Sequence, residues 1–139
     1  VGLKVCVMTN FKWCVWLVPG EGHEWNSLTN GFPAHMTVKS HLERDEAEKL
    51  VKEIDFKPVF VRMFDEQIPE VKDGFNCLYF KVDRECDWFP ENPHISFRYS
   101  YGSNFYPELY NDEIYPWQAL LERIVIVDCS DHFTKWKID

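Results

Sequence analysis

Two short stretches of this sequence share one pattern: AHMTVK at residues 34–39 and PHISFR at residues 93–98. Each stretch reads histidine, apolar residue, hydroxyl residue, apolar residue, base. The six polar residues are His35, Thr37, Lys39, His94, Ser96 and Arg98. Because successive side chains on a β-strand point to opposite faces, the polar residues of each copy share one face and the apolar residues share the other. The pattern therefore predicts two strands. Each has one face of polar side chains able to bind or react and one apolar face that packs into the core.

If the two strands lie side by side, their polar faces form one pocket. A phosphodiester suits such a pocket, because hydroxyl groups can hold its non-bridging oxygens while a base and an acid serve the attacking and leaving oxygens. Histidine titrates near neutral pH, so one ring can act as base and the other as acid, in an order that the sequence does not fix. We expect catalytic roles for His35, His94, Thr37 and Ser96, and phosphate contacts from Lys39 and Arg98. Taken alone, either copy is equally an ordinary half-buried strand.

The composition indicates one globular domain over residues 1–139, with 45% hydrophobic residues and a net charge of −8. Long nucleic acids bind chiefly through neutralisation of phosphates, so this charge favours a small nucleotide or short oligonucleotide as partner. The sequence has no apolar stretch of 18 residues, which excludes a membrane-spanning helix, and no signal peptide is evident. We expect a cytoplasmic monomer without a metal or cofactor.

The five cysteines are odd in number and contain no CxxC motif, so we expect mostly free thiols in a reducing compartment. A disulfide between Cys77 and Cys86 stays open as an alternative.

Periodicity predicts strands at residues 4–10, 11–19, 34–39, 56–67, 75–82 and 94–100, and a closing hairpin at 123–138. An apolar stripe at Ala47, Leu50, Val51 and Ile54 predicts an amphipathic helix, with a capping box at Ser40 and Glu43. Residues 68–74 look like a turn, residues 102–116 like a loop, and residues 117–121 like a short helix. This order of elements favours an α+β fold with antiparallel strands and few helices.

The segments HMTV and HISF resemble the two His-x-Thr/Ser motifs of the 2H phosphoesterase superfamily. WCVWLVP at 13–19 is similar to the first strand of its cyclic-phosphodiesterase branch, and that resemblance places Trp16 and Tyr99 in the nucleotide pocket. By strict alternation Tyr99 faces away from His94, so a bulge or the strand end has to redirect it. The resemblance implies a bilobal α+β fold in which two antiparallel sheets surround a central cleft.

The resemblance also implies metal-independent hydrolysis of a 2′,3′-cyclic phosphate or a 2′–5′ phosphodiester, an RNA-processing type of chemistry. Two alternatives stay open: a non-catalytic nucleotide-binding module, and an RNA 2′–5′ ligase or end-processing enzyme. The aromatic segment at residues 101–117 is either a substrate-binding wall or an ordinary surface loop.

Overall fold

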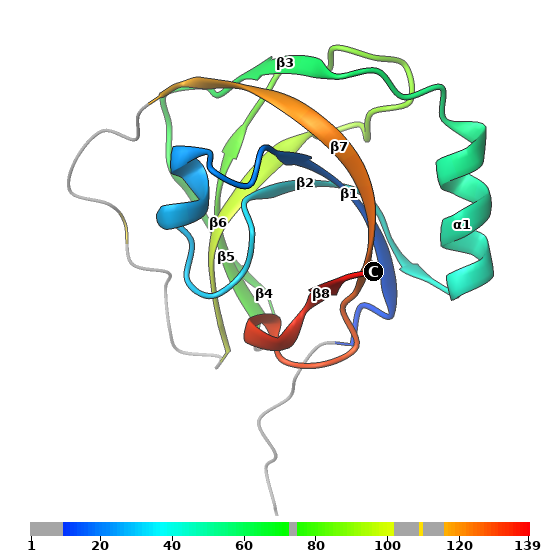
Figure 1. The fold of residues 1–139 in the computed structure, drawn as a ribbon. Coiled ribbons are helices and arrows are strands. Elements are labelled where there is room, and N and C mark those ends of the chain that lie inside the picture. The colour runs from blue at the N-terminus through cyan, green and yellow to red at the C-terminus, as the bar shows by residue number, and fades with distance from the viewer. Residues whose placement is uncertain (1–9, 73–74, 102–108, 110–115) are drawn as a thin grey trace, which may run out of the picture.

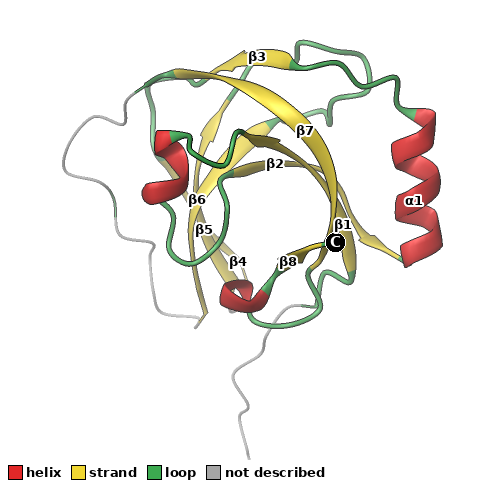
Figure 2. Cartoon of the chain, viewed as in Figure 1, coloured by secondary structure: helices red, strands yellow, loops and turns green. Residues whose placement is uncertain are grey.

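The computed structural model describes residues 10–72, 75–101, 109 and 116–139. Its strands are β1 (Trp13–Pro19), β2 (His35–Leu42), β3 (Val59–Arg62), β4 (Ile68–Lys72), β5 (Phe75–Lys81), β6 (His94–Tyr101), β7 (Gln118–Asp128) and β8 (Lys137–Ile138). Its helices are α1 (Arg44–Glu53) and the two short 3₁₀ helices η1 (Glu24–Ser27) and η2 (Phe133–Lys135). Figure 2 shows that strands dominate the described chain. The predicted α+β class with few helices is confirmed.

The described strands join in one antiparallel sheet of eight strands, in the order β3-β7-β1-β2-β6-β5-β4, with β8 paired to β7. This corrects the expectation of two separate sheets, because β2 and β6 hydrogen-bond to each other. That ladder is short: the recorded pairs are His35 with Ser96 and Met36 with Ile95. The sheet curves strongly, and α1 lies outside the curve while η2 and β8 lie toward its inner side (Figure 1).

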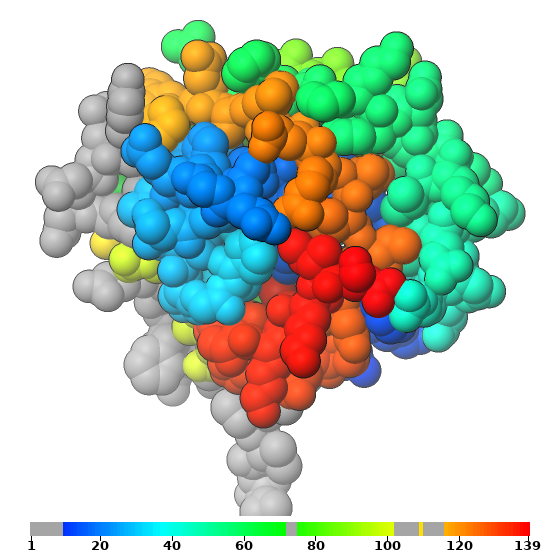
Figure 3. Space-filling model, in the orientation of Figure 1, coloured from blue at the N-terminus to red at the C-terminus, as the bar shows by residue number. Residues whose placement is uncertain are grey.

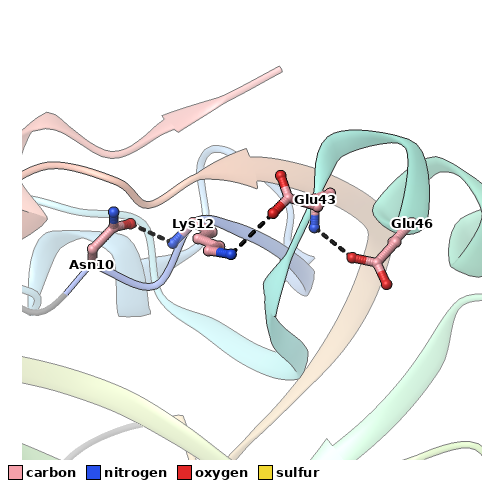
Figure 4. A network of polar contacts seen from close by, with 4 residues as sticks. All are labelled: Asn10, Lys12, Glu43 and Glu46. Carbon is pink, nitrogen blue, oxygen red and sulfur yellow. Dashed lines mark hydrogen bonds and ion pairs between the residues drawn. The ribbon is translucent and has the colours of Figure 1, made fainter.

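Helix α1 begins one turn later than predicted. The capping box is formed by Glu43 and Glu46, with the Glu46 carboxylate 2.8 Å from the Glu43 backbone N–H (Figure 4). Lys12 adds an ion pair of 2.9 Å to the Glu43 carboxylate. The predicted cap at Ser40 is wrong because β2 runs on past that residue. A carboxylate pair at the start of a helix is favourable because it satisfies free N–H groups and opposes the helix dipole.

The two faces of the curved sheet bury different apolar clusters. Val15 on β1 packs with Leu42 and Ala47 beneath α1. The alternate β1 residues Cys14, Trp16 and Val18 face inward. They pack with Phe133 and Trp136 of the C-terminal segment, residues 129–139. In Figure 3 this segment, coloured red, lies at the surface between the chain around η1 and the helix α1. It closes one side of the inner face, on which the site described below lies.

Two local predictions were wrong. Residues 68–74, predicted as a turn, contribute β4, which is the edge strand beside β5. An edge strand tolerates Pro69 because one side of it needs no ladder hydrogen bonds. Of residues 117–121, predicted as a short helix, 118–121 form the start of β7. The predicted strand at 4–10 and the loop at 102–116 lie almost wholly outside the described residues.

Candidate active site

The two predicted motifs lie on neighbouring strands and run in opposite directions. His35 on β2 pairs with Ser96 on β6, and Met36 pairs with Ile95. Continuing this register places Thr37 opposite His94. Directly opposed residues on one face of an antiparallel pair have Cβ atoms about 5 Å apart. Each histidine of one motif is thus the cross-strand neighbour of the hydroxyl of the other, as the side-by-side arrangement requires.

The polar faces of both motifs open into one cavity of about 450 Å³. Its lining includes six of the eight predicted site residues: Trp16, His35, Thr37, His94, Ser96 and Tyr99. A cavity of this size falls within the range typical of small-molecule sites. The sequence therefore predicted six residues that line one cavity of the described chain.

Both imidazole rings are held in the same way by the backbone two residues earlier. The Nδ1 atom of His35 lies 2.8 Å from the carbonyl oxygen of Pro33, and Nδ1 of His94 lies 2.8 Å from that of Asn92. A carbonyl oxygen only accepts hydrogen bonds, so Nδ1 carries a hydrogen in each ring. In the neutral rings Nε2 then carries no hydrogen, which is the state required of a proton acceptor.

His35 is the more enclosed of the two rings. It is 1% exposed, and its ring stacks on Trp16 with centroids 3.5 Å apart and planes 9° apart. Burial lowers the pKa of His35 to about 3; the Pro33 hydrogen bond opposes this shift and His94 adds to it. Burial also raises the pKa of Tyr99, whose hydroxyl stays protonated and donates a long hydrogen bond of 3.3 Å to His35 Nε2. His35 is therefore neutral at ordinary pH.

His94 occupies a more open position. It is half-buried, and its ring lies against Tyr79 at 4.5 Å with the planes tilted by 47°. A charged ring keeps part of its hydration at such a position, which the enclosed His35 does not. The two chemically equivalent motifs thus place their histidines in different surroundings.

Each motif strand carries a β-bulge directly after its hydroxyl residue. Along β2, Thr37 pairs with Trp16 but Lys39 pairs with Val15, so Val38 is an extra residue. A bulge of this kind reverses the face of the residues that follow it, up to the next irregularity, which on β2 lies between Lys39 and Leu42. The residue five positions after the first histidine, Ser40, consequently lines the cavity.

Strand β6 repeats this irregularity. Ser96 pairs with Tyr79 and Arg98 pairs with Leu78, which leaves Phe97 as the extra residue. Tyr99, five positions after its histidine, then faces the cavity. The bulge required to bring Tyr99 to the site is therefore present.

The same bulges remove the two predicted phosphate contacts. Neither Lys39 nor Arg98 belongs to the cavity lining. Lys39 is exposed on β2, and Arg98 lies half-buried on β6. The expectation for these two residues rested on unbroken alternation, and the extra residues Val38 and Phe97 break it.

Several lining residues were not predicted as parts of the site. They are Phe11, Ser40, His41, Glu70, Phe75 and Trp136. Most come from elements whose place in the sheet only the tertiary structure reveals. His41 gives no local signal at all: it has a left-handed backbone with φ of 61° and lies on the continuation of β2.

Thiols form another unpredicted part of the lining. Cys14, Cys77 and Cys129 border the cavity. The Cys77 thiol donates a weak hydrogen bond of 3.6 Å to the Ser96 hydroxyl. These three cysteines and Cys86 are free, so no Cys77–Cys86 disulfide forms.

Two further features bear on the surroundings of the site. Within the described ranges, no group of three or more His, Cys, Asp and Glu side chains is placed to hold a metal ion. The described helices include none that is long and apolar enough to span a membrane.

No protein-family model matches this chain, and neither does any curated protein or solved structure.

Proposed function

We propose that this protein is a phosphodiesterase of the 2H phosphoesterase type. It hydrolyses a 2′,3′-cyclic phosphate or a 2′–5′ phosphodiester of a small nucleotide, by general acid–base catalysis between two histidines. The observation that carries the proposal is the reciprocal pairing of the two motifs, His35 beside Ser96, over one cavity. If the two motifs were unrelated strand segments, nothing would require their histidines to line the same cavity.

In the proposed reaction His35 is the general base. Its neutral ring presents an unprotonated Nε2, because Nδ1 holds the hydrogen donated to Pro33. The nucleophile replaces the Tyr99 hydroxyl at Nε2 and gives its proton to this atom. The nucleophile is water for a cyclic phosphate. For a 2′–5′ bond it is the neighbouring 3′-hydroxyl, whose attack expels the 5′-oxygen and leaves a 2′,3′-cyclic phosphate that water opens in a second turnover. An anionic phosphodiester beside the ring opposes the burial effect on the pKa of His35, so substrate binding strengthens the base.

His94 is the general acid. As the new P–O bond forms and the old one breaks, Nε2 of a protonated His94 gives its hydrogen to the leaving oxygen. Thr37 and Ser96 donate hydrogen bonds to the non-bridging oxygens, where negative charge increases in the transition state. The two histidines supply both proton transfers, so this mechanism uses no metal ion.

The architecture proposed with this function is bilobal. Strands β3-β7-β1-β2 form one lobe and β6-β5-β4 form the other, and the short β2–β6 ladder joins them beneath the cavity. The expectations of a monomeric, cytoplasmic protein acting on small nucleotides belong to the same proposal.

A substrate panel in the presence of EDTA tests the proposal. We expect turnover of at least one member among 2′,3′-cyclic mononucleotides, 2′–5′ oligoadenylate and cyclic dinucleotides, with products resolved by chromatography. His35→Ala and His94→Ala should each lower that turnover by roughly 10²–10⁴-fold. Absence of turnover with tight nucleotide binding would favour the non-catalytic binding module, and a near wild-type rate in either variant would refute the site assignment.

A further inference from the structure

We propose that the nucleobase of the substrate binds at the outer part of the cavity, against Phe75 and Phe11, and that Glu70 selects bases carrying an exocyclic amino group. This inference rests on the proposed function and specifies its substrate class. The cavity lining includes all three side chains.

The two aromatic residues first expected in the nucleotide pocket have little free surface. Trp16 is 1% exposed, and one face of its indole is covered by His35 at 3.5 Å. Tyr99 is 8% exposed and is stacked on Phe75 with centroids 4.9 Å apart. Trp16 positions His35, and Tyr99 supports Phe75, so the base has to stack elsewhere.

Phe75 and Phe11 are more exposed than Trp16 and Tyr99. Both are half-buried although they line the cavity, and their rings meet edge to face at 5.2 Å. Behind Phe75, the nearly parallel Tyr99 ring lies at 19° and fixes its orientation. A preoriented, partly exposed ring in the lining of the cavity is suited to stack any base.

Glu70 is on β4, two strands away from β6, which carries the second motif. It pairs with Cys77 on β5, and Cys77 pairs with Tyr99 on β6. With strands about 4.8 Å apart, Glu70 is displaced across the sheet by about 10 Å from Tyr99. Ser96 lies on the same strand as Tyr99, so the backbone of Glu70 is likewise two strands away from this phosphate-binding hydroxyl residue. Such spacing is favourable because the Glu70 carboxylate and a bound phosphate repel each other.

A carboxylate only accepts hydrogen bonds, so Glu70 recognises N–H donors. Adenine and cytosine each present an exocyclic amino group, and guanine presents an adjacent pair of donors, N1–H and the 2-amino group, that matches two carboxylate oxygens. Uracil has no amino group and places carbonyl oxygens beside its single N–H. We therefore expect guanine to bind best and uracil worst.

Binding measurements test the inference independently of turnover. The ligands are the 3′-monophosphates of guanosine, adenosine, cytidine and uridine, with glycerol phosphate as a ligand that lacks a base, and affinity is measured by calorimetry. Phe75→Leu should weaken nucleotide binding about tenfold and leave glycerol phosphate binding unchanged. Glu70→Gln should abolish the preference for guanosine over uridine monophosphate.

Matched controls exist outside the cavity lining. Phe60→Leu and Glu66→Gln change exposed residues of the same types outside the cavity, and both should bind every ligand as the wild type does. Retained glycerol phosphate binding shows that a variant is folded.

The outcomes separate this inference from the proposed function. Nucleotide binding that is unaffected by both Phe75→Leu and Glu70→Gln would overturn the base site, even if the wild type hydrolyses cyclic phosphates. Failure of the wild type to cleave any 2′,3′-cyclic phosphate or 2′–5′ phosphodiester, including glycerol 1,2-cyclic phosphate, would instead count against the proposed function while base-dependent binding stands.

Discussion

Strands β2 and β6 carry the same chemistry in two different environments. Both hold Nδ1 of the histidine on a carbonyl oxygen two residues earlier, and both have a bulge after the hydroxyl residue. They differ in what surrounds the ring: His35 is enclosed by Trp16 and Tyr99, whereas His94 is half-buried beside Tyr79. Equal geometry with unequal solvation is a physical way to make one of two identical groups a base and the other an acid.

The largest effect on catalytic rate should come from replacing each histidine in turn. His35→Ala and His94→Ala should each lower kcat by roughly 10²–10⁴-fold on a nucleotide substrate. On bis(4-nitrophenyl) phosphate, whose leaving group needs no proton, His94→Ala should keep most of the wild-type rate while His35→Ala stays impaired. The reverse result, measured by nitrophenolate release, would exchange the acid and base assignments.

The enclosure of His35 predicts a pH-dependent stability. Its pKa of about 3 in the folded chain lies below the ordinary value of 6.5, so the unfolded chain binds more protons between these limits. The stability contributed by a neutral His35 is present above pH 6.5 and is lost as pH falls toward 3. At pH 4 the loss should reach about 3 kcal/mol.

Urea unfolding at a series of pH values measures this loss. His35→Asn, which cannot titrate, should flatten the decline in unfolding free energy below pH 6.5, whereas the exposed control Lys39→Met should not. Parallel pH profiles for the wild type and His35→Asn would show that the enclosed ring is not the group responsible.

The two hydroxyl residues test whether the motifs share the phosphate equally. Thr37→Val and Ser96→Ala each remove one hydrogen bond to a charged group, worth about 1.5–3 kcal/mol, so kcat/KM should fall roughly 10- to 150-fold. Similar losses would indicate that the two hydroxyl groups contribute equally to binding of the phosphate. A loss below threefold in either variant would remove that hydroxyl from the site.

Substitution of Trp16 tests how the residue stacked on His35 contributes to catalysis. Trp16→Leu should reduce kcat about tenfold, because His35 loses the flat surface that orients its ring, and Trp16→Phe should restore part of the activity. The affinity for glycerol phosphate and for nucleotides should change in parallel, since Trp16 does not contact the base. A loss confined to nucleotide affinity would instead make Trp16 a stacking surface.

The smallest effect concerns the residues that the bulges turn outward. Lys39→Met and Arg98→Met should leave kcat/KM within about twofold of the wild type, because neither side chain lines the cavity. A large increase in KM in steady-state kinetics would show that either cation reaches the phosphate after all.

The contrast between Thr37 and Lys39 explains how far the sequence could predict the site. Alternation over three residues correctly placed His35 with Thr37, and His94 with Ser96, on the face that lines the cavity, because nothing interrupts the strands there. It failed two residues later because Val38 and Phe97 are ordinary strand residues that give no sign of a bulge. The need for a bulge near Tyr99 was predicted only because the family resemblance required that residue at the site.

The predictions of whole strands and of their positions in the sheet were wrong or incomplete for other reasons. Pro69 made β4 look like a turn, since the sequence does not reveal which strand lies at the edge of a sheet. Phe75, Glu70 and Trp136 reach the cavity through sheet order and through the return of the C-terminal segment. Such long-range placement leaves no local periodic signal.

The paired bulges also matter for how such a protein is compared with others. A deletion of Val38 or Phe97 would restore unbroken alternation, which would turn Lys39 or Arg98 into the cavity and Ser40 or Tyr99 out of it. One missing residue could thus convert a site lined by neutral hydroxyl groups into a cationic one, without altering either His-x-Thr/Ser motif. For chains of this kind, the number of residues after each motif is as informative about the preferred substrate charge as the identity of those residues.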